Sequence, residues 1–187
     1  IKLPMIGIHN IRNATAAISL AFTIGLPEKC IKAGLYNFKG VQRRFTHLFD
    51  HNKISFYDDY AHHPTEISSV LSGVEKVYKN KEIVCVFQPH RISRVISLKK
   101  EFSKCFKKAD TVLLCPIYTA NEKLRLNFTY HSFAKLIIKN SNVRLIQVED
   151  ELQLQKFIKQ NVFGEKIYIG MGAGSISNWM KNLKNIF

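Results

Sequence analysis

The sequence predicts an α/β protein built on a doubly wound, mostly parallel sheet that follows a helical hairpin. Five short β-branched or apolar runs alternate with five amphipathic stretches over residues 54–183, which is the pattern of successive strand–helix units. Residues 10–38 show only helical periodicity. Because two helices alone cannot close a hydrophobic core, the hairpin is expected to end a preceding domain, with the boundary near residues 45–52.

Each expected element is bounded by a change of pattern or by a breaker residue. The hairpin helices are expected at residues 10–24 and 28–38, before Gly25-Leu26-Pro27 and Gly40, because glycine and proline stop helices. The expected strands are residues 54–57, 83–87, 111–114, 143–147 and 166–169. The expected helices that follow them are residues 64–78, 92–107, 130–139, 151–160 and 175–183.

The composition is that of a globular protein with a basic surface. Hydrophobic residues make up 46% of the 187 residues, and 28 Lys and Arg against 14 Asp and Glu give a net charge of +14. No apolar run approaches the roughly 18 to 20 residues of a membrane span, so no membrane partner is expected. Positive charge is also typical of polyanion-binding proteins. The lysines are spread as on solvated helix faces, which favours a basic surface without a nucleic-acid partner.

The first residues and the cysteines bear on the setting of the protein. The segment Ile1-Lys2-Leu3-Pro4-Met5 has no initiator methionine and no secretion signal, so it is expected to be an internal cut. Cys30, Cys85, Cys105 and Cys115 form no C-x-x-C pair, which favours free thiols in a reducing cytosol over disulfides or zinc. We expect a cytoplasmic protein with no metal site in this chain.

The densest group of reactive side chains follows the first expected strand. It reads Asp58-Asp59-Tyr60-Ala61-His62-His63-Pro64-Thr65-Glu66. Ligand sites of open α/β sheets lie beyond the carboxyl ends of the strands, and these groups could bind a metal, bind a ribose or transfer protons. In the structural alternative His63 caps the next helix, Pro64 opens it, and one aspartate accepts backbone donors. The cluster as a whole favours a function.

The segment after the second expected strand is cationic. It reads Gln88-Pro89-His90-Arg91-Ile92-Ser93-Arg94. Arg91 and Arg94 are expected to share one face at the start of a helix, where the positive end of the helix dipole would help them to bind an anion. The alternative is a pair of exposed arginines in surface salt bridges.

Two other segments add candidates. Gly172-Ala173-Gly174-Ser175 follows the last expected strand, and its glycines would let backbone approach a ligand or simply let strand meet helix. Asn10 and Asn13 lie three residues apart at a helix start, and an amide offers donor and acceptor to an adenine edge. Asn10 could instead be the helix N-cap, which would leave Asn13 unexplained.

Taken together, these segments resemble the Mur ligase family. The motifs that carry the resemblance are H-N-x-x-N-A-x-A-A at residues 9–17, F-K-G-V-Q-R-R-F at 38–45, D-D-Y-A-H-H-P-T-E at 58–66, F-Q-P-H-R-x-S-R at 87–94 and G-A-G-S-I-S at 172–177. Their order and spacing cover nearly the whole chain. The resemblance implies that residues 1–46 are the tail of the central ATP-binding domain and residues 47–187 the Rossmann-like, amino-acid-binding C-terminal domain.

The resemblance also implies a reaction. Members of the family phosphorylate a carboxylate with ATP and Mg²⁺, and an amine then attacks the acyl phosphate, so positioning and charge stabilisation dominate catalysis. His62-His63 with residues 88–91 is most similar to the branch that joins L-alanine to UDP-N-acetylmuramate in peptidoglycan precursor synthesis. The alternatives are the branch that recycles the murein tripeptide, which shares A-H-H-P, and a basic α/β module that binds nucleic acid.

Roles for single residues follow from the same resemblance. For the nucleotide, Asn10 and Asn13 would face adenine, Arg44 the ATP phosphates and Asp59 the ribose. The groups expected where the amino acid meets the acyl phosphate are Tyr60, His62, His90, Arg91 and Arg94. The substrate-binding groups would be His90, Arg91, Arg94 and Ser175.

The family's phosphate-binding loop, G-x-x-x-x-G-K-[ST], does not occur in these 187 residues. Its uridine-nucleotide domain and its magnesium ligands are likewise expected outside this chain. Without the loop and its lysine an acyl phosphate cannot be made. The chain alone is therefore expected to be inactive.

Overall fold

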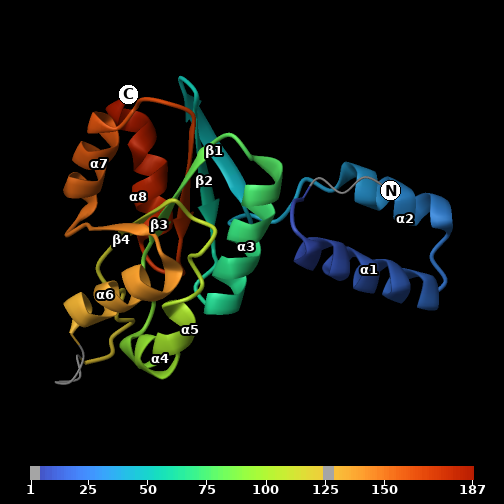
Figure 1. Cartoon of the computed structure of the whole chain (residues 1–187). Coiled ribbons are helices and arrows are strands. Elements are labelled where there is room, and N and C mark those ends of the chain that lie inside the picture. The colour runs from blue at the N-terminus through green and yellow to red at the C-terminus, as the bar shows by residue number, and fades with distance from the viewer. Residues whose placement is uncertain (1–4, 124–128) are drawn as a thin grey trace.

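The computed structural model describes residues 5–123 and 129–187, so the expectation about residues 1–4 lies outside the described part. Two helices, α1 (Ile8–Thr23) and α2 (Glu28–Asn37), form the expected hairpin. The hairpin stands to one side of the sheet in Figure 1. No residue of α1 is buried, and α2 buries only Ile31, so the pair contributes little to the core.

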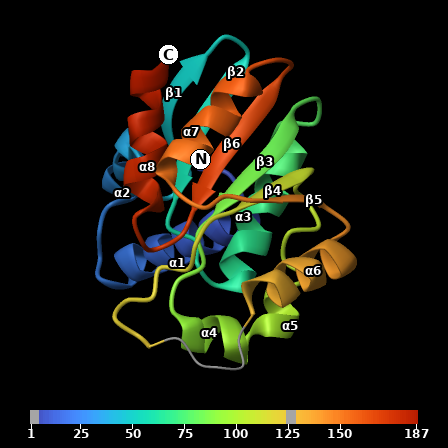
Figure 2. The same ribbon diagram turned by 90° about the vertical axis from the view of Figure 1, so that its left-hand side faces the viewer.

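The rest of the described chain is built on a six-stranded sheet with the order β1-β2-β6-β3-β4-β5. The strands are β1 (Thr46–His51), β2 (Ile54–Asp59), β3 (Glu82–Phe87), β4 (Thr111–Leu114), β5 (Arg144–Gln147) and β6 (Lys166–Met171). Only the β1–β2 pair among them is antiparallel. The predicted mostly parallel α/β sheet is confirmed, and Figure 2 shows β6 lying between β2 and β3.

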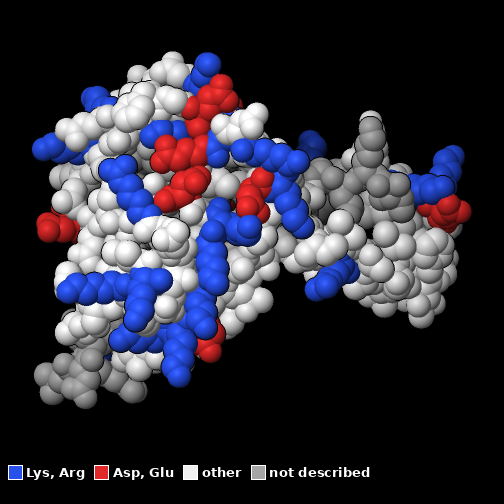
Figure 3. All heavy atoms as spheres, viewed as in Figure 1, with Lys and Arg blue, Asp and Glu red and all other residues white. Residues whose placement is uncertain are grey.

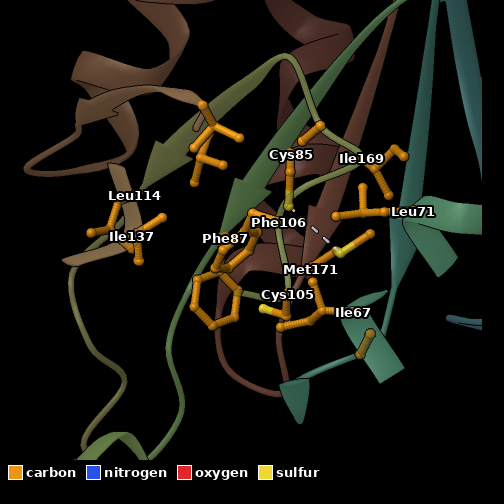
Figure 4. Close-up of a cluster of buried hydrophobic side chains, with 14 of the residues drawn as sticks. Ile67, Leu71, Cys85, Phe87, Cys105, Phe106, Leu114, Ile137, Ile169 and Met171 are labelled. Carbon is orange, nitrogen blue, oxygen red and sulfur yellow. Dashed lines mark hydrogen bonds between the residues drawn. The ribbon is translucent and has the colours of Figure 1, made fainter. Parts of the chain in front are cut away.

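Helices cover both faces of the sheet. They are α3 (Pro64–Val77), α4 (Ile92–Ser97), α5 (Lys99–Phe102), α6 (Tyr130–Ser141), α7 (Glu151–Gln160) and α8 (Ile176–Asn182), followed by the 3₁₀ turn η1 (Leu183–Ile186). Side chains from α3, α5 and α6 pack on one face, and side chains from α7, α8 and η1 pack on the other. Figure 4 shows the first of these clusters, where the sulfur atoms of Cys85 and Met171 lie 3.6 Å apart.

The start of α3 confirms the structural part of the prediction for the first loop. The Nδ1 atom of His63 accepts a hydrogen bond from the Thr65 N–H at 3.3 Å, and Pro64 is the first helical residue. The Glu66 carboxylate accepts from the N–H groups of His62 and His63 at 3.0 and 3.2 Å. This is a capping box, which fixes the direction in which the chain leaves β2.

One strand goes beyond the predicted elements, and one predicted helix is wrong. The boundary region at residues 45–52 contains the strand β1, of which only Phe49 is buried; an edge strand with one covered face lacks the apolar run of the inner strands. The helix expected over residues 92–107 is broken at Leu98, which has φ −110° and ψ 25°. The break lets Phe102 and Phe106 enter the core beneath the sheet.

The topology brings four loops to one edge of the sheet. The strands β2, β3, β4 and β6 are parallel, so their carboxyl ends lie together. The crossover helices α3 and α6 pack on one face and α7 on the other, and the change of face places a topological switch point between β3 and β6. Ligands of open α/β sheets bind at such points.

Candidate functional site

The aromatic and basic groups predicted from the segments after β2 and β3 form one cluster at the carboxyl edge of the sheet, which Tyr118 from the segment after β4 joins. The ring of Tyr60 lies 5.0 Å from that of His62, and His62 lies 5.9 Å from His90, both measured between ring centroids. His90 stacks on Tyr118 at 5.4 Å, and Arg94 Nη1 lies 3.3 Å from His90 Nδ1. Four of the predicted residues are thus neighbours.

The partners of His62 and His90 at Nδ1 give the Nε2 atoms of the two neutral rings opposite hydrogen-bonding roles. His62 Nδ1 lies 2.9 Å from the Tyr60 carbonyl oxygen, which can only accept, so Nδ1 carries a proton in either charge state and the neutral ring has Nε2 as its acceptor. Arg94 can only donate to His90 Nδ1, so neutral His90 carries its proton on Nε2. The pair therefore offers an acceptor and a donor, which suits an ammonium and a carboxylate.

Electrostatics keep His90 neutral. Burial lowers the pKa of His90, and the charges of Arg94, His62 and Arg91 lower it further, against a smaller opposing effect of Glu122. At neutral pH the imidazole is therefore a neutral donor beside a permanent guanidinium cation. This combination can hold a carboxylate through one charge-assisted bond and one neutral bond.

Arg91 does not lie where the sequence predicted. It precedes α4 as the N-cap, with φ +68°, so it does not share the first helical turn with Arg94. Its N–H donates to the Tyr118 carbonyl at 2.8 Å, which ties the β3 loop to the β4 loop, and its side chain is exposed. The pairing of two arginines on one helix face is corrected to one arginine facing His90 and one exposed arginine.

Ser175 lies on the glycine turn after β6, next to the cluster. Its Oγ atom is 3.0 Å from Gln88 Nε2. A Cβ atom on Gly174 would lie 2.6 Å from Cγ of Tyr118, so the turn packs directly against the ring that stacks on His90. The last loop and the histidine cluster are therefore contiguous through Tyr118.

Asp59 has internal partners. Its Oδ2 atom accepts from the Phe45 N–H at 2.8 Å, and its Oδ1 atom accepts from the Ala61 N–H at 2.7 Å. Burial raises the pKa of Asp59 to about 6, although these two hydrogen bonds and Arg44 act to lower it. The carboxylate thus ties the segment before β1 to the loop after β2, as the structural alternative proposed for one aspartate. Its contact with a ribose stays a prediction.

The hairpin residues predicted for the nucleotide line a separate pocket. This pocket of about 620 Å³ lies between α1, α2 and α3, and Asn10, Asn13, Arg44, Glu66 and Val70 are among its lining residues. Helix α1 begins at Ile8 after Gly7, so the N-cap alternative for Asn10 is wrong. Asn10 Nδ2 donates instead to the Ile6 carbonyl at 2.7 Å, while Asn13 is exposed.

Sequence reasoning missed Arg43, which joins the segment before β1 to the loop after β6. Its Nη2 donates to the Gly172 carbonyl at 2.6 Å, its Nε lies 3.4 Å from Asp58 Oδ2, and its guanidinium lies 4.7 Å above the Tyr60 ring. The 3.4 Å approach has no hydrogen-bond geometry, so Nε is buried without a hydrogen-bond partner, and Asp58 Oδ1 is likewise buried without one. The ion pair is therefore electrostatic. The only sequence signal was the adjacency of Arg43 to Arg44.

Within residues 5–123 and 129–187, no three His, Cys, Asp or Glu side chains are grouped so as to hold a metal ion. In the same residues, no helix has the length and apolar character needed to cross a membrane.

Comparisons with known proteins agree with the motifs. Residues 43–173 match the family model of the Mur ligase glutamate ligase domain. The chain is 64% identical over 186 residues to a UDP-N-acetylmuramate–L-alanine ligase of Pelagibacter ubique, covering 100% of this chain and 40% of that protein. The curated relatives are therefore much longer than this chain, which spans about 40% of that length.

Solved structures show the same likeness. A UDP-N-acetylmuramate-alanine ligase from Thermotoga maritima matches with a TM-score of 0.76 and 29% identity, over 99% of this chain and 39% of that one. A murein peptide ligase from Psychrobacter arcticus matches with a TM-score of 0.71 and 22% identity, over 100% of this chain and 38% of that one. The second match is evidence of the fold alone.

Proposed function

We propose a function from one premise: the chain belongs to the Mur ligase family, and its sheet carries that family's glutamate ligase domain. On this premise it forms part of an ATP-dependent ligase that joins L-alanine to UDP-N-acetylmuramate through an acyl phosphate. The observation that carries the proposal is the cluster of Tyr60, His62, His90 and Arg94 at the switch-point edge. The 64% identity to the Pelagibacter ligase supports the choice of branch.

The cluster fits an amino acid in its zwitterionic or neutral-amine form. His90 Nε2–H and Arg94 would take the carboxylate of L-alanine, and exposed Arg91 would add a second cation. His62 Nε2 would accept a hydrogen bond from the amine and hold it toward the acyl phosphate. Such positioning can contribute much of the acceleration of a bimolecular step. Tyr60 and Tyr118 would flank the small side chain, and Ser175 would meet an anionic oxygen.

The pocket between the hairpin and α3 would receive the adenine of ATP. Asn10, Asn13 and Arg44 are among the residues that line the pocket, and Arg44 would meet the phosphate oxygens. Pockets for ligands of this size have volumes of about 300 to 1,000 Å³, a range that includes the volume of about 620 Å³ of this pocket. As the family resemblance implies, Mg²⁺ would be held mainly by the nucleotide and by residues outside this chain.

The proposed setting is the cytoplasm. It is supported by the four cysteines, all of which are free, and by the substrates of the proposed reaction.

Binding of ATP to the 187-residue chain tests the nucleotide part of the proposal. In a calorimetric titration, Asn13→Ala should weaken ATP binding about tenfold, as expected for the loss of a specific hydrogen bond in a ligand site. The matched control is Thr15→Ala, because Thr15 lies on the same helix and its hydroxyl donates only to the Ile11 carbonyl. Equal affinities for both variants would remove Asn13 from the site.

Binding of L-alanine tests the amino-acid part separately. Arg94→Gln should abolish chemical-shift changes caused by L-alanine at residues 88–94 and 172–175, since it removes the cation beside His90. Lys100→Gln is the control, because Lys100 is an exposed cation on α5. An undiminished response in Arg94→Gln would contradict the assignment.

A further inference from the structure

Gln88 is a buried polar residue to which the proposed function assigns no task. It is the first residue after β3, and it is only 3% exposed. Its backbone N–H donates to the Met171 carbonyl at 3.0 Å, so it lies against the end of β6 at the switch point. A buried amide needs partners for both of its ends, and both partners of Gln88 belong to the last loop and α8.

The orientation of the Gln88 amide follows from its contacts. The Ile176 backbone N–H can only donate, and it lies 3.0 Å from Gln88 Oε1. The oxygen must therefore face Ile176, and the Nε2 group faces Ser175 Oγ at 3.0 Å. A bond in the opposite sense, from Ser175 Oγ to Gln88 Oε1, would span 3.4 Å, which is longer than the 3.0 Å between Ser175 Oγ and Gln88 Nε2.

This orientation sets the polarity of the Ser175 hydroxyl. A hydroxyl has one proton and two acceptor positions. When Nε2 of Gln88 occupies an acceptor position, the proton remains to be donated elsewhere. Ser175 is only partly buried, so that proton is available to a ligand.

The glycines of the last loop allow this arrangement. Gly172 has φ +152°, and a Cβ there would lie 2.7 Å from the Gln88 carbonyl oxygen. A Cβ on Gly174 would lie 2.5 Å from Gln88 Oε1. Real Cβ atoms do not approach so closely, so both positions must lack a side chain for Gln88 to reach Ser175 and Ile176.

We infer that Gln88 is a positioning residue that turns the Ser175 hydroxyl outward as a hydrogen-bond donor, so that this side of the site takes an anionic oxygen, carboxylate or phosphate. The inference rests on the proposed function for the ligand class, while the orientation of the hydroxyl rests on the contacts of Gln88 alone. Gln88 touches no substrate itself. Its effect on binding passes through Ser175.

Side-chain amide NMR of the ligand-free chain tests the orientation. Ser175→Ala should shift one Nε2 proton of Gln88 and speed its exchange with solvent, whereas the Ile176 amide should stay protected, because Oε1 keeps its donor. The Gln155 amide, which pairs with Glu151 at 3.4 Å on α7, is the internal reference and should not move. Unchanged Gln88 protons would overturn the inference.

A double-mutant cycle tests the consequence for ligands, with L-alanine and inorganic phosphate titrated separately as probes. Ser175→Ala should weaken binding of the anion that Ser175 contacts about tenfold, as for loss of a hydrogen bond to a charged group. In Gln88→Glu both side-chain oxygens are acceptors, so the Ser175 hydroxyl should donate its proton to the new carboxylate and no longer to the ligand. Binding of the anion should weaken at least as much as in Ser175→Ala. In the Ser175→Ala background, Gln88→Glu should add only a small further loss.

The cycle separates hydroxyl polarity from simple charge repulsion, because repulsion by a new carboxylate would be equal in both backgrounds. The inference would be overturned if Gln88→Glu weakened binding equally in the wild-type and Ser175→Ala backgrounds. It would also be overturned if Ser175→Ala left the binding of both probes unchanged. A response limited to L-alanine identifies a carboxylate site, and a response limited to phosphate identifies a phosphate site. If the wild-type chain binds neither ATP nor L-alanine, the proposed function fails, whereas the Gln88 amide result still decides the orientation.

Discussion

At the scale of single residues, the aspartates after β2 have structural tasks that their position in a reactive cluster conceals. Asp58 is 1% exposed and Asp59 is 2% exposed. Asp58 accepts from the Ser177 hydroxyl at 2.6 Å and faces Arg43, and Asp59 holds two backbone N–H groups. Together they connect the segment before β1, the loop after β2 and α8.

The raised pKa of Asp59 predicts a pH dependence of stability. Its pKa of about 6 in the folded chain exceeds the value of about 3.9 in unfolded chains, so the folded state binds more protons between these values. The contribution of Asp59 is therefore fully present below about pH 4 and is lost as the pH rises through about 6. The free energy of unfolding of wild type minus that of Asp59→Asn should fall over this interval.

Urea denaturation at a series of pH values measures this difference. The subtraction removes the other titrating groups, which both proteins share. A difference that rises with pH over the same interval would mean that the two N–H donors outweigh burial and lower the pKa.

Arg43 predicts a contrast between two adjacent arginines. Arg43→Ala leaves the buried Asp58 carboxylate without its cation, so the free energy of unfolding should fall by about 3 kcal/mol, as for breaking a buried ion pair. Arg44→Ala is the matched control, because Arg44 makes only a 4.0 Å pair with Glu66 at the surface, worth less than about 1 kcal/mol. Similar losses in chemical denaturation of both variants would refute the role of Arg43.

At the scale of elements, α3 connects the two candidate sites. Its first turn carries Thr65 and Glu66, which line the pocket between α1, α2 and α3, and its N-cap is His63, next to His62. Burial raises the pKa of Glu66, but the N–H groups of His62 and His63 and the charges of His62 and Arg44 outweigh burial, so its pKa is lowered. The ionised carboxylate thus anchors the first loop to the helix.

The capping box predicts different effects for two substitutions of Glu66. Glu66→Ala should lower the free energy of unfolding by about 1 kcal/mol, because two backbone donors lose their acceptor. Glu66→Gln should retain most of that stability, since an amide oxygen can fill the same capping position. The measurement is thermal unfolding at neutral pH. An equally large loss in both variants would show that the charge, and not the cap, stabilises the helix.

At the scale of the whole molecule, positive charge is distributed over many elements. On the face seen in Figure 3, Lys and Arg lie in several groups over the sheet-bearing part, and Asp and Glu interrupt the upper groups. Nucleic-acid binding requires a continuous basic path, commonly with exposed aromatic rings. The chain should therefore cause no salt-dependent mobility shift of random RNA or DNA at physiological ionic strength. A clear shift would favour the nucleic-acid alternative.

The catalytic prediction also belongs to the whole molecule. The 187 residues contain no phosphate-binding loop, and without one the γ-phosphate is not cradled for transfer. Purified chain supplied with ATP, Mg²⁺, UDP-N-acetylmuramate and L-alanine should form no ADP above background in a coupled assay. Turnover that scales with the concentration of the chain would contradict the prediction.

Most of the elements, and the family, follow from local features of the sequence. Strands β2 to β6 and helices α1, α2, α3, α6, α7 and α8 were predicted within a few residues, because hydrophobic periodicity and breaker residues are local signals. The positions of the reactive loops followed, because parallel strands end at one edge. The motifs around Asn10, Asp59 and Gln88 then indicated the Mur ligase family, to which the chain belongs.

Which of these residues meet depends on contacts between distant parts of the chain. The break at Leu98 accompanies the burial of Phe102 and Phe106 in the core, which periodicity does not reveal. Arg43 contacts Gly172 across 129 residues of sequence, and Gln88 contacts Ser175 across 87. Both contacts exist because β6 inserts between β2 and β3. Strand order depends on the pairing of distant segments, so no local pattern could assign these partners.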